Sequence, residues 1–181
     1  LAISEFPTIE AEPLGTFTLQ RKTLKQESRI RRITDFEFDG VGRICILQTM
    51  ANGVVCLLLV DQSGNVVEEL CLEEGALHRR PYTCSNPAWV GADQFVFAVS
   101  KRGEGGTAQC WIADFADGTL KEIKGLKCPT IRSLAGFQDG HFVALTENRQ
   151  KTILADGLYF FEKTGQCLWH IDDAHDSEMP E

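Results

Sequence analysis

The sequence contains one hairpin pattern three times, and this repeat limits the chain to a small set of β-sheet folds. Each copy has an apolar run, a short polar turn with a glycine, and a second run that is only half apolar. The copies are residues 54–70 (VVCLLLVDQSGNVVEEL), residues 108–123 (AQCWIADFADGTLKEI) and residues 157–171 (GLYFFEKTGQCLWHI). The acidic residues that close the first runs are Asp61, Asp114 and Glu162, and the glycines that follow them are Gly64, Gly118 and Gly165. Apolar runs joined by such a turn predict a β-hairpin in each copy.

Two further strands are predicted ahead of each hairpin, so that the chain forms three similar units of four strands. The units are residues 33–72, 87–123 and 131–171. The clearest strands are predicted at residues 43–50, 54–60, 95–100, 109–114, 141–146 and 157–162. Ile44, Phe95 and Phe142 open the second strands, and they are spaced 51 and 47 residues apart. A regular spacing of this size indicates a repeated structural unit.

A repeat of this length with four strands per unit resembles the blades of β-propeller repeat proteins. The resemblance covers residues 33–171 and rests on the strand pattern, because no unit ends in the Trp-Asp dipeptide of WD40 repeats or carries the glycine pair of kelch repeats. We therefore expect an all-β fold of four-stranded antiparallel blades that form part of a propeller. A two-sheet β-sandwich is the alternative, although it gives no reason for three similar units.

Charged segments flank the three units on both sides. Residues 1–32 contain one predicted strand, at residues 15–20, followed by a basic connector at residues 21–32. The connector has one anion, Glu27, and its six cations are Arg21, Lys22, Lys25, Arg29, Arg31 and Arg32. Residues 172–181 form an acidic tail, which we expect to be disordered. The net charge of −8 argues against a broad phosphate-binding surface, so nucleic acid is an unexpected partner.

The cysteines and the apolar runs bear on where the protein resides. Seven cysteines are present, and Cys45, Cys56 and Cys110 lie inside apolar strands, where we expect them to be buried and without disulfides. This usage favours a reducing, cytoplasmic compartment. The longest apolar run, residues 54–60, is far shorter than the roughly 20 residues that cross a membrane, and residues 1–10 lack the features of a secretory signal.

The candidate binding residues lie in the longest connection between units, at residues 71–87. They are His78, Arg79, Arg80 and Tyr82, because two arginines beside an aromatic side chain suit a carboxylate, a phosphate or a protein partner. Two other sites can be considered in the same connection. Cys84 could act as a nucleophile with His78 as its base, or Cys71, His78 and Cys84 could together bind a metal ion. Neither set has the spacing of a known site, so no catalytic residue, metal or cofactor is predicted.

The expected function follows from the number of units. Three blades do not close a propeller, which takes roughly 4–8 blades, so the first and last units should expose apolar faces unless residues 1–32 and the tail build part of a fourth blade. We therefore expect a non-enzymatic module that binds protein partners, or a second copy of itself, within a larger chain or complex. The alternatives are the propeller part of an enzyme, with a site built from the loops of several blades, and a ligand or nucleic-acid sensor that uses the basic connector and the loop with Arg79 and Arg80.

Overall fold

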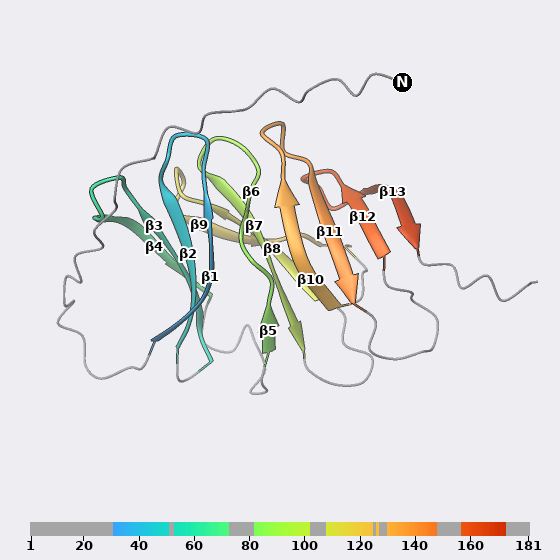
Figure 1. Ribbon diagram of the computed structural model, residues 1–181, viewed down its shortest axis with the longest axis horizontal. Coiled ribbons are helices and arrows are strands. Elements are labelled where there is room, and N and C mark those ends of the chain that lie inside the picture. The colour runs from blue at the N-terminus through green and yellow to red at the C-terminus, as the bar shows by residue number, and fades with distance from the viewer. Residues whose placement is uncertain are drawn as a thin grey trace, which may run out of the picture.

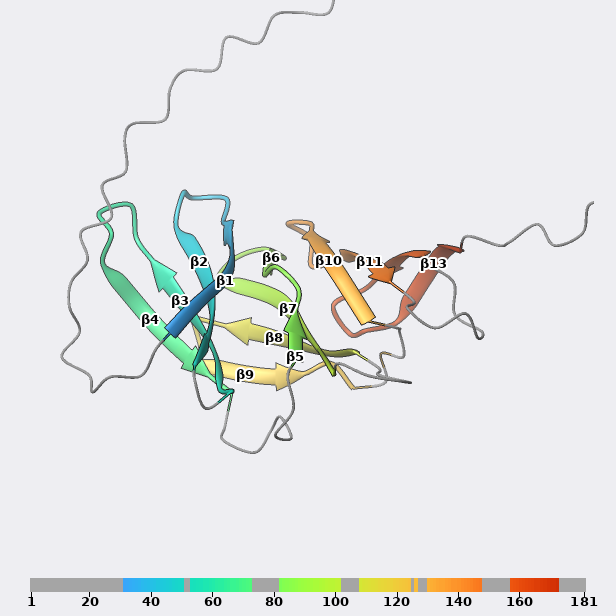
Figure 2. The ribbon, with the colours of Figure 1, turned by 60° about the horizontal axis from the view of Figure 1, so that its bottom comes forward.

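The computed structural model describes residues 31–50, 53–72, 82–101, 108–124, 126, 130–147 and 157–172. Every helix or strand within these residues is a β-strand, so the fold is all-β as the sequence predicts. The described strands form three separate antiparallel sheets, and none of these sheets closes on itself. The three sheets lie in a row, with the middle sheet between the other two in both views (Figures 1 and 2).

The first and last sheets have four strands each, arranged in chain order. The first sheet consists of β1 (Arg31–Phe38), β2 (Ile44–Met50), β3 (Val55–Val60) and β4 (Val66–Cys71). The last sheet consists of β10 (Thr130–Gly136), β11 (Phe142–Glu147), β12 (Gly157–Phe161) and β13 (Cys167–Asp172).

The middle sheet has five strands, because its first strand is split into two short pieces that both pair with the next strand. It consists of β5 (Tyr82–Cys84), β6 (Ala88–Trp89), β7 (Gln94–Lys101), β8 (Ala108–Asp114) and β9 (Thr119–Glu122). The six clearest strands predicted from the sequence are confirmed in the three sheets, each to within one residue at either end.

The same turn joins the first and second strands of all three sheets. In each, a backbone N–H donates to a carbonyl four residues later: Asp39 to Arg43, Val90 to Gln94, and Phe137 to His141, at 2.9–3.0 Å. The accepting residue is followed directly by Ile44, Phe95 or Phe142. The spacing that the sequence shows therefore corresponds to an equivalent hydrogen bond in each sheet.

The first strand of each sheet is also interrupted at the same place. Thr34 interrupts the register of β1 against β2, and Arg132 interrupts that of β10 against β11. In the middle sheet the interruption is longer, and Ser85, Asn86 and Pro87 separate β5 from β6. β5 lies within the connection at residues 71–87, which was predicted to be a loop, so that prediction is wrong for residues 82–84. Pro87 lacks a backbone N–H and marks the break in strand pairing between β5 and β6.

Two buried apolar clusters hold the sheets together. One lies between the first and middle sheets and includes Leu47, Leu57 and Phe97; the other lies between the middle and last sheets and includes Ala98 and Phe142. Successive residues of a strand point to opposite faces. The middle sheet is therefore apolar on both faces because it has a neighbouring sheet on each side.

Charged side chains connect the first and middle sheets at their turns. Arg43 donates hydrogen bonds to Asp39 in its own turn and to Asp93 in the β6–β7 turn. Burial of Asp39 raises its pKa, but hydrogen bonds from the Arg43 side chain and from the backbone N–H groups of Arg43 and Val41 outweigh it, so the pKa lies below its ordinary value. Asp39 is therefore ionised at neutral pH and bound to the Arg43 guanidinium.

Candidate interaction faces

The residues proposed from the sequence as a binding loop fall mostly outside the described part of the chain. His78, Arg79 and Arg80 lie in the gap between residues 72 and 82. Tyr82 is the first residue of β5, where its backbone is paired with that of Lys101. A binding role for this loop therefore stays a prediction. The predicted strand at residues 15–20 and the tail beyond Asp172 also lie outside the described residues.

The first sheet has an apolar face on the side away from the middle sheet. Directly opposed residues in neighbouring strands lie on the same face of a sheet. The register places Phe36, Ile46 and Leu58 in one row across β1, β2 and β3, and a second row contains Phe38, Ile44, Val60 and Val66. We call these residues, with Ile33, Gln48, Cys56, Glu69 and Cys71, the first-sheet outer face.

Most of the exposed part of the first-sheet outer face lies on β1. Phe36 is 55% exposed and Phe38 is 45% exposed, and their rings meet edge to face at 5.9 Å. Ile33 and Val66 are exposed as well, whereas Cys56, Leu58 and Val60 on β3 are buried. Two phenylalanines and an isoleucine exposed side by side are a feature of interaction surfaces rather than of an ordinary solvated strand.

The last sheet has a matching apolar face on the side away from the middle sheet. One row contains Val143, Phe160 and Trp169, and the next contains Leu145, Leu158 and Ile171. We call these residues, with Phe137, the last-sheet outer face. Trp169 is 45% exposed and Ile171 is 63% exposed.

Aromatic side chains form a continuous cluster on the last-sheet outer face. The rings of Phe160 and Trp169 stack at 5.2 Å, and His141 stacks on Phe160 at 5.3 Å. Phe137 meets Phe160 edge to face at 5.8 Å. Large, rigid aromatic groups of this kind contribute most of the binding energy in many protein interfaces.

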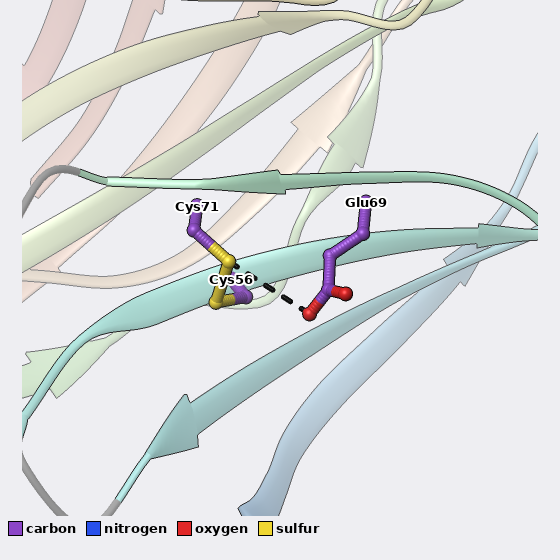
Figure 3. A group of neighbouring side chains, drawn as sticks. All are labelled: Cys56, Glu69 and Cys71. Atoms are coloured by element: carbon purple, nitrogen blue, oxygen red, sulfur yellow. Dashed lines mark hydrogen bonds between the residues drawn. A yellow bond between two sulfur atoms is a disulfide. The ribbon is translucent and has the colours of Figure 1, made fainter. Parts of the chain in front are cut away.

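A disulfide between Cys56 and Cys71 lies on the first-sheet outer face and connects β3 to β4 (Figure 3). The prediction that Cys56 carries no disulfide is therefore wrong. The Leu72 N–H donates to the Val55 carbonyl, which makes Cys56 and Cys71 a non-hydrogen-bonded pair, the type of antiparallel pair in which the Cα atoms approach most closely. Their Cα atoms are 4.0 Å apart. Cys56 is fully buried and Cys71 is exposed, so solvent reaches the bridge from the β4 side.

Glu69 completes a small group with the disulfide, since its Oε1 atom lies 3.8 Å from Cys71 Sγ (Figure 3). Two cysteines and a carboxylate this close together could hold a metal ion if both thiols were free. Metal ligands of this type are thiolates, and the sulfur atoms of a disulfide carry no such charge. In the oxidised form described here, the group is a covalent link between strands.

A hollow of about 330 Å³ adjoins the disulfide where the edge strands β4 and β9 meet. Leu70, Leu120 and Trp111 contribute apolar side chains to its lining, and Glu69 is the one charged residue among the lining residues of the described chain. Ligand sites of this size usually combine an apolar lining with several convergent polar groups. The lining of this hollow instead matches the margin of the apolar core between the two sheets.

Cys84 and Cys45, which lie outside this group, are poorly suited to nucleophilic chemistry. Burial raises the pKa of Cys84 to about 11, although a hydrogen bond with Thr49 acts in the opposite direction. Burial also raises the pKa of Cys45, strongly. Because the thiolate is the reactive form, a raised pKa opposes the nucleophilic role considered for Cys84.

The described residues thus define an all-β protein of three stacked antiparallel sheets with apolar faces at both ends of the stack. No family model, curated protein or solved structure matches this chain. Among the described residues there is no helix with the length and apolar character that a membrane crossing requires.

Proposed function

We propose that this chain is a non-enzymatic β-propeller-type module that binds protein partners through its two end faces, as part of a larger chain or complex. The observation that carries the proposal is the exposure of large apolar side chains on both outer faces, above all Phe36, Phe38, Trp169 and Ile171. A soluble protein rarely leaves such clusters in water unless another surface covers them.

The propeller part of the proposal is supported by the repeated features of the three sheets. Each has the same turn after its first strand and an interruption at the same place in that strand. Neighbouring sheets pack face to face through apolar clusters, which is how propeller blades are arranged. A β-sandwich would need two sheets to share one core, whereas here the middle sheet contributes to two.

A cytoplasmic location is part of the proposal as well. It is supported by Cys45 and Cys84, which carry thiols in the structure, and the bridge between Cys56 and Cys71 argues in the opposite direction. The redox state of Cys56 and Cys71 in the protein isolated from cells under alkylating conditions tests this point. A quantitative bridge in freshly lysed cells would contradict a reducing compartment.

The interaction proposal is tested by sedimentation of the purified chain together with a dye that fluoresces on exposed apolar surface. We expect either a species larger than 20.1 kDa or a monomer that binds the dye strongly. Phe36→Asp and Trp169→Asp should each reduce association or dye binding, because a charge would be placed on one outer face. Val41→Asp is the control, because Val41 is exposed in the β1–β2 turn and lies on neither face. A cooperative 20.1 kDa monomer without dye binding would contradict the proposal.

A further inference from the structure

We infer that the partner of each end face is a second copy of this chain, bound head to tail, so that the last-sheet outer face of one copy covers the first-sheet outer face of the other. The inference rests on the proposed function and names the partner. It comes from comparing equivalent residues in the three sheets, since the chain contains both halves of the same repeated interface.

The faces directed toward the preceding sheet are the first half of that interface. The residue that opens the second strand is Ile44, Phe95 or Phe142, and it points toward the preceding sheet in each case. Phe95 is buried against the first sheet and Phe142 is buried against the middle sheet, each at 0% exposure. Ile44 occupies the equivalent position in the first sheet, where the described chain provides no preceding sheet, and it belongs to the first-sheet outer face.

The faces directed toward the following sheet are the second half. The residue three positions further along the second strand is Leu47, Ala98 or Leu145. Leu47 packs against the middle sheet and Ala98 packs against the last sheet, and both are fully buried. Leu145 is the equivalent residue in the last sheet, and it is 41% exposed. The two end faces are therefore the unmatched halves of an interface that occurs twice within the chain.

The complementary halves differ from each other, so the expected contact is heterologous and joins unlike faces. Two copies joined through both pairs of faces provide six sheets, which lies within the roughly 4–8 blades of closed propellers. A closed pair leaves neither end face in water. An assembly through like faces would leave the repeated contact unused.

Charge supports the same orientation. The sequence that leads into β1 is basic, whereas the sequence that leaves β13 is acidic. The cations are Arg21, Lys22, Lys25, Arg29, Arg31 and Arg32, and the anions are Asp172, Asp173, Asp176, Glu178 and Glu181. A head-to-tail contact pairs the first sheet with the last sheet, so segments of opposite charge adjoin the paired sheets in the sequence, and opposite charges favour association.

The test uses one variant for each face and their mixture. Phe36→Asp disables the first-sheet outer face, and Trp169→Asp disables the last-sheet outer face. Each variant alone breaks both contacts of the pair, because every contact needs one face of each kind. We expect wild-type protein to sediment as a dimer, each variant to weaken the dimer by about thirtyfold or more, and a one-to-one mixture to recover a dimer held by its one intact contact.

Ile33→Asp and Ile171→Asp repeat the test at more exposed positions in case a first variant fails to fold, and Val41→Asp should leave the dimer unchanged. A dimer that is weakened by one variant only would show that like faces meet, and would overturn the inference. A mixture that stays monomeric would overturn it as well. A monomeric wild type that binds the dye would remove the second copy as partner and leave another protein to cover the faces. A monomer without dye binding would remove the proposed function itself.

Discussion

The side chain of Asn86 in the middle sheet pairs with the backbone of Leu134 in the last sheet as a neighbouring strand would. Its Nδ2 atom donates to the Leu134 carbonyl at 2.7 Å, and its Oδ1 atom accepts from the Leu134 N–H at 2.9 Å. Ser133 donates to the same Oδ1 atom at 3.0 Å. Asn86 lies between β5 and β6, where the first strand of the middle sheet is interrupted. The residues of this interruption therefore connect the middle sheet to the last sheet.

Asn86→Ala should lower the free energy of unfolding by about 2–3 kcal/mol, because two backbone groups of Leu134 lose their partner. Asn86→Asp should be at least as harmful, since a carboxylate cannot donate to the Leu134 carbonyl. Urea unfolding measures both changes. Gln109→Ala is the matched control, because the Gln109 amide is exposed and bonds only at 3.3 Å to Glu122. Equal losses at positions 86 and 109 would show that the contact between the sheets contributes nothing.

The ion pair of Asp39 with Arg43 should make stability fall at acid pH. The pKa of Asp39 is lower in the folded protein than in the unfolded chain. Ionised Asp39 therefore adds to the free energy of unfolding above the unfolded pKa of about 3.9, and this stabilisation is lost as the pH falls through the lower folded value. Asp39→Asn should abolish this part of the pH dependence. We expect the stability difference between wild type and Asp39→Asn to be full near neutral pH and to shrink in acid.

Other carboxylates contribute in acid as well. Hydrogen bonds from the Asn65 backbone and side chain lower the pKa of Asp61, and for Asp114 burial raises the pKa but hydrogen bonds from the Gln94 side chain and from its own turn outweigh it. The test of Asp39 therefore uses the difference in free energy of unfolding between wild type and Asp39→Asn at each pH, because the wild-type values alone contain the effects of all the carboxylates. A difference that stays constant into strong acid would show that Asp39 does not titrate as described.

Gly91 should tolerate a side chain much less than Gly64 does. Both have positive φ angles, +104° and +80° respectively, which any L-residue adopts at a cost. A Cβ atom on Gly91 would lie 2.2 Å from the Gln138 carbonyl oxygen of the last sheet, whereas a Cβ atom on Gly64 would meet nothing within 4 Å. Gly64→Ala should cost about 1 kcal/mol, and Gly91→Ala about 1–3 kcal/mol more, because the last sheet must move. Thermal unfolding of the two variants measures the difference, and equal losses would contradict the close approach.

The cysteines should react with an alkylating reagent in an order set by exposure and bonding. Cys167 is exposed and should react first, Cys84 should react slowly because of its raised pKa, and Cys45 and Cys110 should react only after unfolding. Cys56 and Cys71 should react only after reduction, which mass spectrometry of alkylated peptides can show. Reduction should also lower stability by about 3 kcal/mol, the value for a loop near the 15-residue separation of this bridge. Alkylation of Cys71 in native protein without reductant would contradict the bridge.

The strands were predictable from the sequence because each is a short apolar run bounded by a turn. The repeat was predictable because Ile44, Phe95 and Phe142 recur at nearly constant spacing. β5 was missed for a physical reason: it has three residues, Pro87 shortly after it cannot donate to a partner strand, and the Asn86 side chain beside it bonds to Leu134, 48 residues away. A local pattern contains no information about such a partner.

The disulfide was missed because it depends on a single extra residue. A regular hairpin that starts from the pair Val60 and Val66 would place Leu70 opposite Cys56. The register shifts between Leu59 and Val60, and Val67 is the additional residue on β4, so Cys71 comes to lie opposite Cys56 instead. The two end faces were expected in outline from the number of units, but which side chains they expose follows from the register.

The register shifts in the edge strands are β-bulges, and they affect how this protein can associate with other chains. The outermost strands β4 and β13 have a register shift at equivalent positions, and the first strands β1 and β10 have one as well. An incoming strand needs an unbroken row of backbone donors and acceptors, and a bulge disrupts that row. The first and last sheets are thus poor templates for strand addition at either edge, so crowding of many copies should favour contacts through faces over the growth of fibrils.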